Sequence, residues 1–208
     1  KGINNLKSST GNAFSQIKNI VAGLGIDKLI SASFNIINNS IDSAISRLDT
    51  LNNYPKVMSN LGIASDDAKK SIEKMSDKLS GLPTTLDQGA LAVQRFTSKN
   101  SDVGKSTDYF LALNNALLAG GASADIQSTA LEQLSQSYAK GKPDMMEWRS
   151  IQTAMPAQLN QVAQSFGITS DQLGEALRNG KISMDDFMDK IVELNENGTG
   201  EFQSFEEQ

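Results

Sequence analysis

The chain has 208 residues, of which 38% are hydrophobic, 21% charged and 6% aromatic, and its formal net charge is -5. It contains neither Cys nor His, which excludes disulfides, thiolate or imidazole metal sites, and nucleophiles activated by His. We therefore expect an ordered globular protein of one large or two small domains, without the commonest catalytic groups and without a cofactor.

Charge is unevenly distributed along the chain. Residues 1–60 carry a net charge of +3, residues 61–142 are neutral, and residues 143–208 carry -8. The acidic last third argues against direct nucleic-acid binding, which needs Lys and Arg on one face.

The longest apolar run, at 20–26, is far shorter than the roughly 20 residues that span a membrane. No signal peptide is visible. Because the chain opens on Lys rather than Met, we expect a piece of a longer protein.

The first predicted unit is an N-terminal helical arm over residues 1–54. An amphipathic stretch at 14–24 precedes a helix at about 28–52, where apolar residues recur at spacings of four and three. This spacing is typical of a long bundle helix or of a self-associating coiled coil, and we favour the bundle helix. Part of the seam is a candidate docking surface, made of Ile30, Phe34, Ile37, Ile41 and Leu48.

A compact bundle of shorter helices is predicted for residues 55–195, which gives an all-α fold class, and residues 196–208 are predicted to be a linker. The expected helices lie at about 65–79, 85–98, 106–119, 124–140 and 184–194, with two more beginning near Pro143 and Pro156 and a short one after Thr169. The expected N-terminal caps are Ser65, Ser106, Thr169 and Ser183. The repeated apolar positions of these helices, from Ala68 to Leu194 and including Ile126, are the predicted core.

Two similar stretches mark helix ends. The sequences LGIASDD at 61–67 and FGITSDQ at 166–172 share a large residue, Gly, Ile and Ser-Asp. We interpret each as a left-handed Gly that ends one helix, an Ile that packs back, and a Ser or Thr that caps the next helix. This interpretation is favoured over a duplicated binding motif.

Three further patterns suggest chemistry, and each has a simpler structural explanation. GKST at 104–107 resembles the end of a phosphate-binding loop, but Lys99 stands where that loop needs Gly, and no strand precedes it. Residues 195–206 match the frame of a calcium loop but offer one carboxylate at the usual ligand positions. Asp185, Asp186 and Asp189 fall in the first turns of a helix, where acids stabilise the helix dipole.

Four stretches, taken in order, resemble the tape measure domain of bacteriophage and prophage tail-length tape measure proteins. They are SRLDTL at 46–51, YPKVMSNLG at 54–62, YAKGKPDMMEWRSIQTAMP at 138–156 and FGITSDQLGEALRNGKISMDDFMDKI at 166–191. The resemblance covers roughly residues 25–195. It implies a structural protein of the virion tail, assembled in the host cytoplasm, and not an enzyme.

The resemblance also implies partners: the major tail-tube protein, tail assembly chaperones and the remainder of the chain itself.

In such proteins the tail tube grows around a long helical ruler. This fragment is interrupted by Gly or Pro every 12 to 20 residues, so we expect a folded domain near the N-terminal side of the ruler. A compact 208-residue body would have a radius of gyration of about 17 Å. That body is bulky for a narrow tube, so we expect it at one end of the tail or to be removed or unfolded. Two alternatives stay open, a peptidoglycan hydrolase and a weak calcium-binding helical module.

Overall fold

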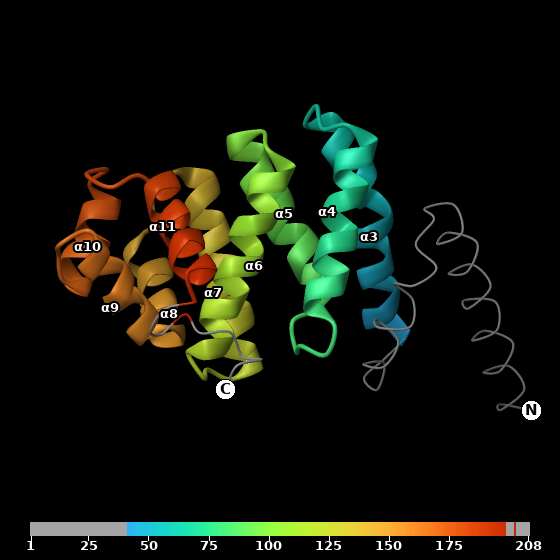
Figure 1. The fold of residues 1–208 in the computed structure, drawn as a ribbon. Helices are drawn as coiled ribbons and strands as arrows, with labels where there is room; N and C mark the ends of the chain where they lie inside the picture. The colour runs from blue at the N-terminus through green and yellow to red at the C-terminus, as the bar shows by residue number, and fades with distance from the viewer. Residues whose placement is uncertain (1–40, 199–201, 203–208) are drawn as a thin grey trace, which may run out of the picture.

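The computed structural model describes residues 41–198 and residue 202. This described part of the chain is all-helical, without a strand, in agreement with the predicted fold class. With the labels of Figure 1, the helices are α3 (Ile41–Asn60), α4 (Ser65–Leu79), α5 (Leu86–Asn100), α6 (Val103–Ala119), α7 (Ala124–Lys140), α8 (Met145–Ala154), α9 (Pro156–Ser165), α10 (Ser170–Arg178) and α11 (Met184–Glu196). No described helix is both long enough and apolar enough to cross a membrane.

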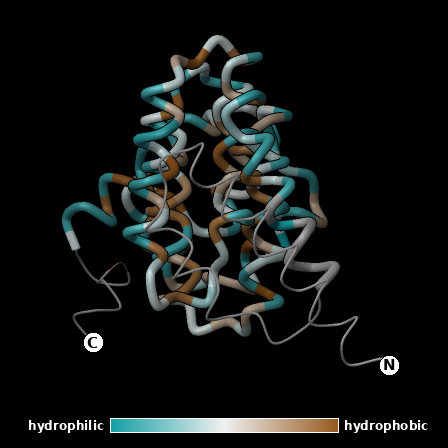
Figure 2. Tube along the Cα trace, turned by 90° about the vertical axis from the view of Figure 1, so that its right-hand side faces the viewer, coloured by the Kyte–Doolittle hydropathy of each residue, from teal (hydrophilic) through white to brown (hydrophobic). Residues whose placement is uncertain are grey.

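The helices stand side by side in two layers (Figure 1). Helices α3, α5 and α7 contact one another in sequence to form one layer, while α4, α6 and α11 form the other. Helix α8 packs along α7, and α9 with α10 completes the end of the row opposite α3. Hydrophobic positions lie mostly between the helices and hydrophilic positions mostly outside (Figure 2). Burying one apolar face of each helix between two layers is the usual solution for amphipathic helices.

The core contains most of the chain's large apolar and aromatic side chains. The largest fully buried ones are Tyr54, Tyr109, Tyr138, Phe96, Phe110, Phe187, Phe202, Met58, Met75, Leu113, Leu117 and Leu134. Apolar periodicity predicted most of these positions. Ile126 and Met146 were also predicted in the core, but their side chains are 40% and 80% exposed on α7 and α8.

Helix α3 differs from the helix predicted at 28–52, since it continues through Pro55 to Asn60. Proline removes one backbone donor from a helix, yet Tyr54 and Met58 on either side of it are fully buried. Packing against α4 and α5 therefore holds the helix across this position. The first 40 residues, and with them most of the predicted arm, lie outside the described residues, so the division at residue 54 stays a prediction.

Helix starts follow capping chemistry, but three predicted starts are wrong by a few residues. Ala64, not Ser65, is the N-cap of α4. Helix α6 begins earlier than expected because Asp102 accepts a hydrogen bond from the Lys105 amide at 2.9 Å, which leaves Ser106 inside the helix. Pro143 precedes the helix it was expected to begin, since Asp144 is the cap of α8.

The other predicted helix ends are confirmed. Thr169 and Ser183 cap α10 and α11, each in a reciprocal capping box with the residue three positions on. Gly62 and Gly167 have positive φ values of 81° and 71°. The amides of the following Ile63 and Ile168 donate back to the preceding helices at 3.0 Å, which is the Schellman pattern expected for both similar stretches.

Candidate interaction surface

The predicted docking surface on the N-terminal arm cannot be placed on the structure. Ile30, Phe34 and Ile37 lie outside the described residues, and so do the side chains of Ile41 and Leu48. This docking surface therefore stays a prediction. The polar clusters and exposed faces of the described helices are the remaining candidate sites.

Three aspartates on α11 have separate roles. Asp186 completes the capping box at the start of the helix. Asp185 and Asp189, one turn apart, accept hydrogen bonds from Tyr138 and from Tyr109, the latter at 2.6 Å. Asp185 and Asp189 thus bond α11 to α7 and α6, a structural role in addition to the predicted stabilisation of the helix dipole. No sequence pattern pairs residues so far apart.

The two tyrosines belong to an aromatic cluster with Phe96. The three rings meet edge to face, with centroids 5.1 to 6.0 Å apart, a geometry that aromatic quadrupoles favour. Lys105 on α6 pairs with Asp189 at 3.0 Å and lies 5.3 Å from the centroid of the Tyr109 ring. Burial, then the carboxylate acceptors, raise the pKa values of Tyr109 and Tyr138 well above 10. The cluster thus joins α5, α6, α7 and α11 with neutral phenols.

The frame of a calcium loop at 195–206 begins inside α11. The Oδ1 atom of Asn195, at the first ligand position of the frame, accepts a hydrogen bond of 2.6 Å from Asn115 on α6. Phe202 is fully buried in the core. Thr199, Gly200 and Glu206 lie outside the described residues, and no group of three or more His, Cys, Asp or Glu among the described residues could hold a metal ion. The bond from Asn115 makes Asn195 part of the α6–α11 interface.

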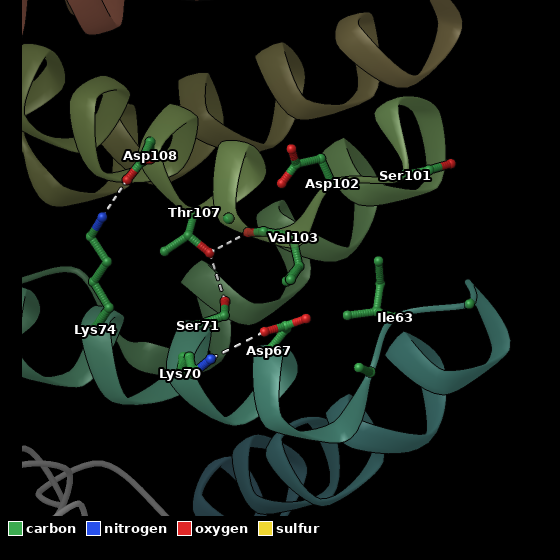
Figure 3. A pocket seen from close by; sticks show the side chains of 13 residues that line it. Ile63, Asp67, Lys70, Ser71, Lys74, Ser101, Asp102, Val103, Thr107 and Asp108 are labelled. Carbon is green, nitrogen blue, oxygen red and sulfur yellow. Dashed lines mark hydrogen bonds and ion pairs between the residues drawn. The ribbon is translucent and has the colours of Figure 1, made fainter.

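A groove of about 570 Å³ lies between α4 and the first half of α6 (Figure 3). Its two lysines are paired with neighbouring carboxylates, Lys70 with Asp67 at 3.4 Å and Lys74 with Asp108 at 2.5 Å. Thr107, from the GKST sequence, points into the groove, where Ser71 lies opposite it (Figure 3). The charges of the groove are therefore largely balanced within it, and the ion pair of Lys74 connects α4 to α6.

A chain of hydroxyl groups runs behind this groove. Tyr54 on α3 bonds to Ser71 on α4 at 2.9 Å, and Ser71 bonds to Thr107 on α6 at 2.7 Å. Thr107 donates to the Val103 carbonyl at 2.6 Å. Burial raises the pKa of Tyr54 to about 12, and the hydrogen bond with Ser71 opposes this only in part. Because the hydroxyl groups of Tyr54, Ser71 and Thr107 all have partners, these buried polar groups connect three helices.

The α7–α8 turn is built around a buried carboxylate. Glu147 is only 5% exposed and accepts hydrogen bonds from the Asp144 amide at 2.8 Å, the Ser137 hydroxyl at 3.0 Å and the Lys140 amine at 2.8 Å. Asp144 in turn caps the Met146 and Glu147 amides. The hydrogen bond to Glu147 raises the pKa of Lys140, and the bond from the Glu147 amide lowers that of Asp144.

The first turn of α8 carries the most exposed large apolar side chains among the described residues. Met145 is 50% and Met146 is 80% exposed, although Trp148 and Ile151 of the same helix are buried. Arg149, one turn further, is also exposed. Two lysines lie beside these residues. Lys142 is exposed in the turn, and the Lys99 amine lies 3.9 Å from the position that a Cβ atom on Gly141 would occupy. We call Met145, Met146, Lys99, Lys142 and Arg149 the methionine surface.

Sequence patterns did not predict the methionine surface. A Met beside a Trp in an amphipathic helix suggests core, so Met145 and Met146 were expected to pack against other helices. The signal in the sequence is position: both methionines directly follow the cap Asp144 and come just before the first buried residues of the helix, Glu147 and Trp148.

Comparison with known proteins gives one kind of match. A protein-family model described as "Tape measure protein" matches residues 42–208. No curated protein and no solved structure matches.

Proposed function

Because the chain belongs to the tape measure protein family, we propose that it is a structural scaffold and interaction domain that acts in phage tail assembly and tail-length determination. The family match, which extends over all the described helices, is the observation that carries this proposal. In this role the domain acts through shape and contact and not through catalysis. Its place is the virion tail, with assembly in the host cytoplasm.

The packing of the helices supports a folded role distinct from that of a ruler. A ruler needs a helix whose length grows by about 1.5 Å per residue. Here the helices run back and forth, and α11 returns to pack beside α6. The domain is a body with a fixed shape, so it contributes a contact site at one end of the tail or has to unfold before it enters the tube.

The partners we propose are the major tail-tube protein, the tail assembly chaperones and the rest of the chain itself. Self-association through the N-terminal arm is a further proposal that rests on its apolar seam. Direct nucleic-acid binding is not part of the proposed function, since the net charge of the chain is -5.

Deletion of residues 124–154 from the full-length gene tests this proposal. The deletion removes α7 and α8, which pack against each other and against α5, α6 and α9. We expect few or no tails in electron micrographs, because the body cannot form its core. A ruler would instead give tails shortened by about 45 Å, at about 1.5 Å per residue.

The intact gene supplied in trans serves as the control and should restore tails. Tails of normal number and normal length in the deletion strain would contradict the proposed function.

A further inference from the structure

The two methionines of the methionine surface are not needed by the fold. Their side chains are 50% and 80% exposed, so half or more of the accessible surface of each stays in contact with water after folding. Methionine is flexible and polarisable, and it recurs at surfaces that bind other proteins. An exposed pair at the start of a helix therefore marks a place where a partner could bury apolar area.

Three cations flank the pair without a charge partner. Within the described residues, Lys99, Lys142 and Arg149 have no ion pair and no side-chain hydrogen bond. The fourth cation of the turn, Lys140, is paired with both Asp144 and Glu147. Residues 140–149 together with Lys99 thus carry four positive groups against two carboxylates, in a chain whose net charge is negative.

This combination of charge and apolar surface selects the kind of partner. A second copy meeting the same surface face to face would oppose like charges, which costs binding energy. Anionic membranes and DNA duplexes bind through clusters of four or more free cations, and the methionine surface offers three. An acidic protein segment with apolar side chains satisfies both features.

We propose that the methionine surface docks an acidic protein segment, with apolar side chains placed on Met145 and Met146 and carboxylates directed at Lys99, Lys142 and Arg149. This inference rests on the proposed scaffold function only in so far as a scaffold needs such a partner. The segment would belong to another tail protein.

Methyl NMR of the 208-residue chain with labelled methionine tests the proposal. The probe is a synthetic helical peptide that has two Leu residues four positions apart and Glu at the flanking positions. The chain contains seven methionines, and all except Met145 and Met146 are buried: Met58, Met75, Met155, Met184 and Met188. We expect the peptide to shift the two exposed methyl signals and to leave the five buried ones unchanged.

Variants separate the apolar and the ionic parts of the surface. We expect Met146→Ser to weaken binding about tenfold, since it removes a large part of the buried apolar area. We expect Arg149→Glu to weaken it about fivefold, with the loss reduced at high salt. The matched controls are Ile126→Ser and Lys78→Glu, an exposed apolar residue and an exposed cation outside the surface, and they should leave the affinity within about twofold.

Several results would overturn the proposal. They are no methyl shift at millimolar peptide, equal binding of a peptide with Gln in place of Glu, or equal losses in the control variants. Stronger binding of a DNA duplex or of anionic vesicles to the same two methionines would also overturn it. Because the titration uses purified chain, its failure would leave the tail phenotype of the 124–154 deletion unaffected, and the two proposals can fail separately.

Discussion

At Gly174 helix α10 approaches Trp148 more closely than any side chain would permit. A Cβ atom built on Gly174 would lie 2.3 Å from the indole Nε1 atom. We therefore expect Gly174→Ala to lower the free energy of unfolding by about 1 to 3 kcal/mol, the usual cost of overpacking a core. Urea unfolding followed by Trp fluorescence measures this change.

Gly104→Ala is the control for this substitution. Gly104 is exposed near the start of α6, and its only close neighbour is the Asp102 side chain at 3.3 Å. There the higher helix propensity of Ala should leave the stability unchanged or raised by up to about 1 kcal/mol. Equal losses at both positions would argue against a close approach of α10 to Trp148.

All three tyrosines of the chain resist ionisation. Burial raises the pKa of Tyr54 to about 12, and burial with the Asp189 and Asp185 acceptors raises those of Tyr109 and Tyr138 further. The unfolded chain loses these protons near pH 10, so the stability contributed by the neutral phenols is complete below pH 10 and falls above it. The fall is roughly 1.4 kcal/mol per pH unit for each tyrosine.

We expect phenolate absorbance to stay low above pH 10 and then to rise together with the loss of helical circular dichroism. Denatured chain in urea is the control and should titrate near pH 10. A smooth titration of one or more tyrosines in the folded chain would contradict the buried positions of their hydroxyl groups.

Burial at single residues was largely predictable from apolar periodicity, and the failures have a common cause. Ile126 and Met146 lie in the first turns of α7 and α8, where a helix projects past its neighbours. Periodicity gives the direction in which a side chain points along a helix but not whether another helix reaches that turn. The acceptor roles of Asp185 and Asp189 depend in the same way on which helix lies opposite.

The α7–α8 turn depends on Glu147 more than on any other polar residue. Its carboxylate receives donors from Asp144, Ser137 and Lys140 at 2.8 to 3.0 Å while almost entirely buried. We expect Glu147→Ala to cost about 2 to 3 kcal/mol of unfolding free energy, because the buried Ser137 hydroxyl and the Asp144 amide lose this acceptor and Lys140 loses its partner. Thermal and urea unfolding both measure this loss.

Glu147→Gln should cost less, since the amide oxygen still accepts from the turn while the ion pair with Lys140 is lost. Glu175→Gln, on the exposed face of α10, is the control and should change stability by less than about 0.5 kcal/mol. An unchanged unfolding free energy in Glu147→Ala would show that the turn forms without this acceptor.

The presence of each helix was predictable from the sequence, whereas the residue at which each helix begins was less predictable. The caps Thr169 and Ser183 were predicted correctly because each bonds to a residue only three positions further along the chain. Asp102 caps α6 in place of the predicted Ser106, because its carboxylate bonds a free amide of the first turn. Asp144 caps α8 in the same way, so that Pro143 precedes the helix and not its first turn as predicted. Such competition between neighbouring cap residues is decided by backbone geometry that a sequence pattern does not contain.

For the molecule as a whole, the position of α3 decides which truncations are tolerated. Deleting residues 1–40 removes no contact described here, whereas deleting 1–54 removes most of α3 together with the fully buried Tyr54. We expect the longer deletion to lower the melting temperature by about 10 °C relative to the shorter one, from the loss of a buried aromatic residue and its packing.

Circular dichroism melting of both truncated proteins and of the full 208-residue chain checks this expectation. Equal melting temperatures for the two truncations would support a separate arm that ends at residue 54, as the sequence first suggested. A lower temperature for the longer one would place α3 in the body.

The all-helical class followed from the 3.6-residue periodicity, but the order of the helices in space did not. Short loops predict that consecutive helices are neighbours. They do not predict that α11 packs beside α6, where Asp189 meets Lys105 and Tyr109. That arrangement depends on contacts between residues 80 or more positions apart, for which one sequence offers no signal.

The return of α11 to the side of α6 also fixes how the domain would respond to tension. A pull on the chain after α11 reaches Phe202 first, then the Asn195–Asn115 bond, then Asp189 with its two partners, and last the Asp185–Tyr138 bond. These attachments break one after another and not together, so α11 should peel away at low force. Single-molecule stretching from that end would then show one early extension step before the remaining layers open.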